Sequence, residues 1–151
     1  FGISGSDFAK GINLAAAAAD AGRGVPVVSA YSPAVSDSPL DQMLDGDAIS
    51  YWAGTGDLAT FVLFLGEPRE LGGVEVIWSN GSTRSYKFDI LASLDGVNYE
   101  LVYSGSSKPG AGPQEYMFTK PVKASFVKMV GYGNNTNQWT SVAEFAVLAK
   151  K

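Results

Sequence analysis

The feature that most constrains the fold is a two-residue alternation of apolar and polar side chains that recurs along most of the chain. Neighbouring side chains in a strand point to opposite faces, so this alternation predicts strands with one face toward a core. The alternating segments are short and rich in Val, Phe and Tyr, which favour strands. There are eight such segments: 25–31, 59–65, 73–78, 86–92, 99–105, 114–119, 125–132 and 141–149.

Turn-forming residues separate these segments. Asp95-Gly96, between "FDILAS" and "VNYELVY", is the strongest hairpin signal. Short strands joined by turns predict an antiparallel β-sandwich rather than alternating strands and helices. The other predicted turns contain Gly, Pro or Asn and lie at 66–68, 80–81, 108–110 and 133–135.

Only the Ala-rich segment "NLAAAAADAGRG", residues 13–24, predicts a helix. Gly22 and Gly24 would end it after about two turns. We interpret the polar lead at 1–12 as the end of an interdomain linker. A length of 151 residues fits one domain with a single core, which we assign to 13–151.

Composition removes several function classes. The chain has no Cys and no His, which excludes disulfides, thiolate nucleophiles, imidazole bases and the usual zinc ligands. A net charge of −4 argues against nucleic acid as a partner. Asp57, Asp89 and Glu115 lie on different predicted elements with no catalytic motif around them, so no enzyme is predicted.

The stretch "LDGDAISYW", residues 44–52, contains hard oxygen donors of the kind that calcium prefers. Asp45 and Asp47 flank Gly46, and Ser50 follows with a hydroxyl. The spacing differs from that of an EF-hand loop. By themselves these residues favour a solvated turn that leads to a buried Trp52, and a metal site is the alternative.

Glu144 is the only charged residue in the apolar strand pattern "SVAEFAVL". A buried carboxylate needs a partner or an ion. The alternative is an edge strand from which Glu144 points to solvent.

Several spaced motifs together resemble discoidin-type domains, which include the C domains of coagulation factors and the family 32 carbohydrate-binding modules. The resemblance extends over residues 13–148. Within the family, "VGYGNNTNQWTSVAEF" is most similar to modules attached to bacterial polysaccharide lyases, alginate lyases among them. The implied fold is all-β, a jelly-roll sandwich of about eight antiparallel strands like that of galactose-binding domains. The motifs are, in order, "NLA", "LDGDAISYW", "FVLFLGEPRELGGVEVIW", "FDILASLDGVNYELVYSG" and "FVKMVGYGNNTNQWTSVAEFAV".

The resemblance implies a structural calcium ion that joins the 44–52 loop to the last strand. This ion would tie the two ends of the domain together where coagulation-factor members have a disulfide. Carried over from the family, its ligands are the carbonyl of Gln42, the side chain of Asp45, the carbonyl of Asp47, Ser50, the carbonyl of Ala143 and the side chain of Glu144.

The resemblance also places sugar binding in two loops at one end of the sandwich. Sugars are held by an aromatic face together with forked polar groups, a combination present in "IWSNGSTRSYK" and "GYGNNTNQW". Several of these residues have a plainer alternative: Trp78 could cap the sandwich edge, Arg84 could pair with Asp89 or Glu115, and the asparagines of "GYGNNTNQW" could form turns. We expect Trp52 and, less strongly, Trp139 to lie in the core. The predicted carbohydrate-binding residues are Trp78, Asn80, Arg84, Lys87 and Asn134.

The resemblance implies a non-catalytic carbohydrate-binding module. We expect it to be secreted and monomeric, and to be covalently attached to a catalytic domain. Modules that bind terminal galactose combine a His with an Arg, and this chain has no His. That departure favours an acidic algal polysaccharide such as alginate. The alternative is a discoidin domain for cell-surface adhesion that binds a protein or a membrane. The predicted loop tips are polar, which argues against a membrane.

Overall fold

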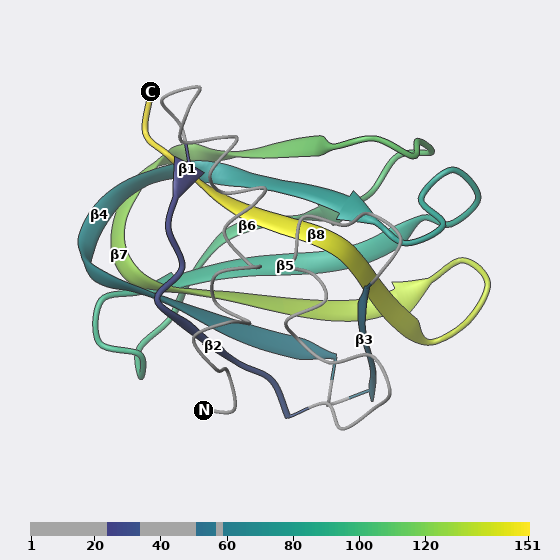
Figure 1. Cartoon of the computed structure of the whole chain (residues 1–151), viewed down its shortest axis with the longest axis horizontal. Coiled ribbons are helices and arrows are strands. Elements are labelled where there is room, and N and C mark those ends of the chain that lie inside the picture. The colour runs from purple at the N-terminus through teal and green to yellow at the C-terminus, as the bar shows by residue number, and fades with distance from the viewer. Residues whose placement is uncertain (1–23, 34–50, 57–58) are drawn as a thin grey trace.

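The computed structural model describes residues 24–33, 51–56 and 59–151, which form eight antiparallel strands and no helix (Figure 1). None of these described residues belongs to a helix able to span a membrane. The strands are β1 (Gly24–Val25), β2 (Ser29–Tyr31), β3 (Trp52–Thr55), β4 (Thr60–Trp78), β5 (Tyr86–Ser93), β6 (Glu100–Ser106), β7 (Gln114–Asn134) and β8 (Trp139–Ala149).

Strands β4 and β7 are long and belong to both layers of the sandwich, as their curved ribbons in Figure 1 show. In one layer, the N-terminal part of β4 lies between β2 and the C-terminal part of β7. This part of β7 also pairs with β5. The second part of β4 pairs with β8 and with the first part of β7. Strand β6 extends the first layer beside β5. In the second layer, β1 and β3 pair with opposite ends of β8. The predicted all-β sandwich of about eight antiparallel strands is confirmed.

Several predicted boundaries were wrong. Segments 59–65 and 73–78 form the single strand β4, and 114–119 and 125–132 form the single strand β7. The turn predicted at 66–68 is a bend inside β4, because Gly66 adopts a φ of 83° and the register shifts between Phe64 and Arg69 without ending the strand.

The first predicted strand is two strands in the structure. Segment 25–31 divides into β1 and β2, with Pro26, which has no N–H to donate to a ladder, immediately after β1. Strand β3 was not predicted. The helix predicted at 13–24 and the linker at 1–12 lie outside the described residues, except for Gly24, which is in β1.

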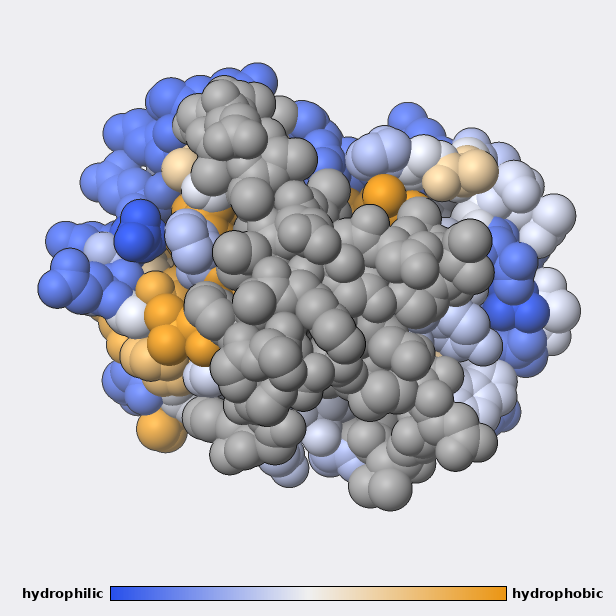
Figure 2. All heavy atoms as spheres, viewed as in Figure 1, coloured by the Kyte–Doolittle hydropathy of each residue, from blue (hydrophilic) through white to orange (hydrophobic). Residues whose placement is uncertain are grey.

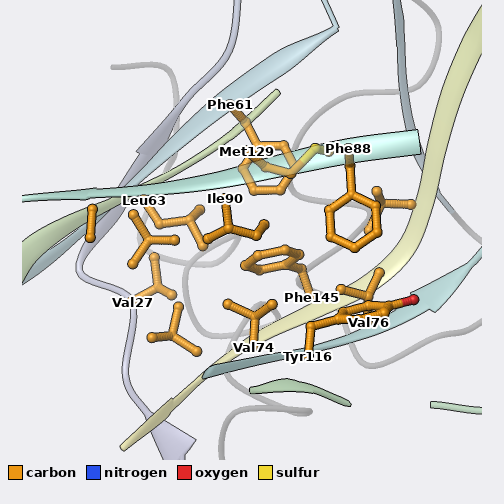
Figure 3. Packing of buried hydrophobic residues seen from close by; sticks show 14 of the residues in the cluster. Val27, Phe61, Leu63, Val74, Val76, Phe88, Ile90, Tyr116, Met129 and Phe145 are labelled. Atoms are coloured by element: carbon orange, nitrogen blue, oxygen red, sulfur yellow. The ribbon is translucent and has the colours of Figure 1, made fainter. Parts of the chain in front are cut away.

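The core fills the space between the two layers, as Figure 3 shows for Phe61, Ile90 and Phe145. Phe61 packs edge-on against Trp52 and Phe145, with ring centroids 5.1 and 5.0 Å apart. Trp52 is 1% exposed, which confirms its predicted place in the core. This rigid interior supports the loops at both ends of the sandwich.

Candidate functional site

Three loops are joined by hydrogen bonds at one end of the sandwich, on the right in Figure 1. The N–H of Gly110 donates to the carbonyl of Gly81 at 3.0 Å, which links the β6–β7 loop to the β4–β5 loop. Ser85 and Asn135 bond twice, through Ser85 N–H to Asn135 Oδ1 at 2.9 Å and Asn135 N–H to Ser85 carbonyl at 3.2 Å. The predicted approach of the 77–87 and 131–139 segments is therefore confirmed. We call this region the loop end.

The surface of the loop end is polar. Figure 2 shows mostly pale to blue residues there. The exposed residues of its two principal loops are Asn80, Ser82, Thr83, Asn135, Thr136, Asn137 and Gln138.

Asn80 shapes the β4–β5 loop through its backbone. Its φ is 53°, a left-handed conformation that Asn tolerates better than most residues. Its carbonyl accepts hydrogen bonds from the N–H groups of Thr83 and Arg84 at 3.1 and 3.0 Å. This tight turn fixes the backbone of Arg84, whose side chain is half-buried. Among the described residues, Arg84 forms no ion pair with Asp89, whose carboxylate accepts hydrogen bonds from Ser104 and Tyr132, and the pairing with Glu115 stays an alternative.

Asn134 organises the β7–β8 loop. Its Oδ1 accepts from the N–H groups of Thr136 and Asn137, at 2.7 and 3.0 Å. Its Nδ2 donates to Asn137 Oδ1 at 2.9 Å and to the carbonyl of Trp139 at 2.7 Å. These four bonds give Asn134 the turn-forming role that was the alternative for this residue, and its contact with sugar stays a prediction.

Trp78 is also not available to a sugar. It is 2% exposed, its indole N–H donates to the hydroxyl of Tyr116 at 2.8 Å, and its ring stacks on Tyr86 with centroids 4.8 Å apart. Burial, which outweighs the hydrogen bond from Trp78, raises the pKa of Tyr116 to about 12. The prediction of a stacking platform was wrong at Trp78, and the alternative, packing within the sandwich, is correct.

Trp139 is the exposed tryptophan of the loop end. Its side chain is 42% exposed at the start of β8, where the expectation from sequence leaned toward the core. Its N–H donates to Asn137 Oδ1 at 2.9 Å, so the loop fixes its backbone on both sides. The next residue, Thr140, is fully buried, and its hydroxyl accepts from the N–H of Gly133 at 3.0 Å. Neighbouring side chains of a strand point to opposite faces, so the inward Thr140 directs Trp139 outward.

Lys87 lies outside the loops. It is an exposed residue of β5 opposite Ser106, on the outer face of the first layer. Asn80, Arg84 and Asn134 are therefore the predicted carbohydrate-binding residues whose position at the loop end still suits that role.

The predicted calcium site lies only partly within the described residues. Gln42, Asp45, Asp47 and Ser50 fall outside them. Glu144 is buried in β8 at 2% exposure, so the alternative of a solvent-facing Glu144 was wrong. The ladder of β8 is interrupted at Ala143, since Ile77 pairs with Glu144 and Trp78 with Val142. Residues 24–33, 51–56 and 59–151 contain no cluster of three acidic side chains suited to a metal.

The fold is an antiparallel β-sandwich with a polar loop end. The family profile of the F5/8 type C domain matches residues 27–145, and the chain belongs to this family. A comparison with curated protein sequences found no match.

Solved structures with the same fold include carbohydrate-binding modules. The CBM32 of AlyQ in complex with 4,5-unsaturated mannuronic acid is 27% identical, with a TM-score of 0.76, covering 80% of this chain and 94% of that one. A truncated AlyQ with CBM32 and alginate lyase domains is 25% identical, with a TM-score of 0.78 over 85% of this chain. This chain spans 34% of that protein. A pectin-binding module, 22% identical with a TM-score of 0.75 over 80% of this chain and 89% of that one, shares the fold.

Proposed function

We propose that this chain is a non-catalytic carbohydrate-binding module that binds a polysaccharide at the loop end. The observation that carries the proposal is the interlocking of two polar loops, one ending at Arg84 and the other leading to the exposed ring of Trp139. A guanidinium and an aromatic face, with hydroxyls and amides between them, are the groups that hold a sugar ring. Membership of the F5/8 type C family and the likeness to CBM32 modules support this class of ligand.

We propose an acidic polysaccharide, such as alginate, as the ligand. Arg84 can take a carboxylate through two parallel hydrogen bonds, which a neutral sugar does not offer. The bound mannuronic acid derivative in the AlyQ module supports this assignment. The β4–β5 and β7–β8 loops of the loop end expose polar residues, which favours sugar over a lipid surface at this end of the sandwich.

We propose that the module targets an attached secreted enzyme to this polysaccharide and acts as a monomer. The AlyQ structure that contains both a CBM32 and an alginate lyase domain supports the attachment.

The test is titration calorimetry against mannuronate oligosaccharides and a neutral galactan. We expect dissociation constants in the micromolar to millimolar range, about −8 to −4 kcal/mol, that rise with salt. Arg84→Ala should abolish most of the binding. Arg69→Ala is the matched control, because Arg69 is an exposed arginine at the bend of β4. Equal losses in both variants, or salt-independent binding of the galactan alone, would contradict the acidic ligand.

We also propose a structural calcium ion at Glu144. Support comes from the burial of this carboxylate in β8 and from the adjacent interruption of the ladder at Ala143, since bulges free backbone groups from regular pairing. Hard carboxylate and carbonyl oxygens suit calcium. The remaining proposed ligands are Gln42, Asp45, Asp47 and Ser50.

Thermal unfolding with and without calcium tests this ion. A ligand at about 100 times its dissociation constant stabilises by roughly 2.7 kcal/mol, so EDTA should lower the Tm of the wild type. Asp45→Ala should have a low Tm that neither EDTA nor calcium changes. Identical melting curves of calcium-loaded and calcium-stripped wild-type protein, with stripping verified by metal analysis, would rule the site out.

A further inference from the structure

A shallow groove runs along the outer face of the first layer, beside the loop end. It has a volume of about 590 Å³. Four of its lining residues belong to β7, and Thr60 of β4 and Gln138 of the β7–β8 loop also line it. The groove therefore begins at the loop end and continues onto the sheet. Its lining residues include Gly56, Thr60, Lys128, Val130, Tyr132 and Gln138.

Tyr132 presents an exposed ring in a fixed orientation at the loop-end side of the groove. The side chain is 56% exposed, yet its hydroxyl donates to Asp89 Oδ2 at 2.7 Å. Asp89 Oδ1 in turn accepts from the hydroxyl of Ser104 at 2.6 Å, so the ring is tethered across β7, β5 and β6. The hydrogen bond to Asp89 is the main cause of a raised pKa at Tyr132. A tethered aromatic ring offers a contact surface without the entropy cost of ordering it on binding.

Lys128 provides a positive charge farther along the same groove. It is four residues before Tyr132 on the same strand, about 13 Å away at the usual rise of a strand. Its ammonium lies over the ring of Tyr99, 5.2 Å from the centroid, which restrains it. The spacing exceeds the width of one sugar ring.

We propose that this groove is a second subsite, which binds the continuation of an acidic saccharide chain whose first sugars occupy the loop end. Tyr132 stacks on a pyranose ring, Gln138 bonds hydroxyl groups, and Lys128 attracts a carboxylate of a later sugar. This inference rests on the proposed function and deepens it, since the module then binds the interior of an acidic chain rather than a single terminal sugar. The combination of one ring, one amide and one cation favours a polyuronate over a neutral chain.

Chain length is the variable that separates the two subsites. We expect a mannuronate hexasaccharide to bind about tenfold more tightly than the trisaccharide, because only the longer chain fills the groove. Tyr132→Ala should remove this gain and leave the trisaccharide affinity unchanged. Tyr132→Phe keeps the ring and should keep most of the gain. Lys128→Gln should reduce the gain, whereas Lys123→Gln, which removes the same charge from an exposed position of β7, should not.

The outcomes are distinguishable by calorimetry. If the trisaccharide binds, and the hexasaccharide binds no more tightly, or loses nothing in Tyr132→Ala, the groove is not a subsite, although the loop end still binds sugar. If neither oligosaccharide binds the wild type, the proposed function is wrong and this inference is wrong with it. A normal melting transition of Tyr132→Ala shows that the variant is folded.

Discussion

The β5–β6 loop and the β7–β8 loop are built in the same way but present different surfaces. In each, one side chain caps the turn: Asp95 accepts from the N–H groups of Val97 and Asn98, both at 2.8 Å, as Asn134 accepts from those of Thr136 and Asn137. Each loop also has a glycine with positive φ next to that residue, Gly96 at 77° and Gly133 at 83°. In both loops, the capping side chain and the glycine hold the backbone in a defined turn without regular strand pairing.

The difference lies in what each loop exposes and contacts. Around Asp95 the loop exposes two large apolar side chains, Leu94 at 57% and Val97 at 79% exposure. Around Asn134 they are amides and hydroxyls, and Asn135 joins the neighbouring β4–β5 loop. A rigid turn alone therefore does not make a binding site. The site requires that the turn be combined with a second loop and with groups that recognise a ligand.

The largest effect is expected from the two glycines. An Ala Cβ at Gly133 would lie 3.0 Å from the Asn137 carbonyl oxygen and the Gln138 Cα, whereas at Gly96 it would meet only the ring of Phe126, at 3.0 to 3.2 Å. The backbone of Asn137 and Gln138 can move aside less easily than the ring of Phe126. We expect Gly133→Ala to lower the free energy of unfolding by about 2–3 kcal/mol and Gly96→Ala by about 1–2 kcal/mol, measured by urea denaturation. A greater loss at Gly96 would show that the two loops do not differ in this way.

A smaller effect is expected from the cap itself. Asn134→Ala removes four hydrogen bonds in an exposed loop and should lower the free energy of unfolding by about 1–2 kcal/mol. It should also weaken sugar binding, because the carbonyl of Trp139 loses the hydrogen bond from the Asn134 side chain. Asp95→Ala is the matched control and should leave sugar affinity unchanged. Equal losses of affinity in the two variants would contradict the distinction between the loops.

The smallest effect concerns pH and should appear at only one of the loops. Hydrogen bonds from Asn98 and Val97 lower the pKa of Asp95 well below its usual range, and this carboxylate is fully exposed. A depressed pKa stabilises the fold above the unfolded value, about 3.9, and the stabilisation is lost as the pH falls toward the folded value. The difference in stability between wild type and Asp95→Asn should thus shrink below about pH 4. The difference between wild type and Asn134→Ala should stay constant in the same titration, since an amide does not ionise. A constant difference for Asp95→Asn would show that its hydrogen bonds do not favour the charged form.

The regular parts of the fold were predictable from local patterns. The two-residue alternation identified most strand residues, and Asp95-Gly96 gave the β5–β6 hairpin. The continuity of β4 was not predictable, because Gly66 and Pro68 are equally typical of a turn and of a bend within a strand. The outcome depends on whether β7 follows the same bend, which is a property of the tertiary structure.

The candidate site was less predictable than the fold, because exposure depends on packing between distant elements. Trp78 and Trp139 both end or begin a strand next to a polar loop, and the sequence offers little to distinguish them. Trp78 is buried because Tyr86 and Tyr116, from β5 and β7, surround it. Trp139 is exposed because Thr140 occupies the inward position beside Gly131. Asn134 was recognisable as a turn former, but the partners of its four hydrogen bonds depend on the loop conformation and could not be read from the sequence.

The central claim is that the loop end, and not the opposite β5–β6 loop, binds an acidic saccharide. A crystal structure of the protein grown with a mannuronate hexasaccharide tests it most directly. We expect sugar density against Arg84 and Trp139, with a uronate carboxylate facing the guanidinium. Density confined to the surface around Leu94 and Val97, with the loop end empty, would contradict it.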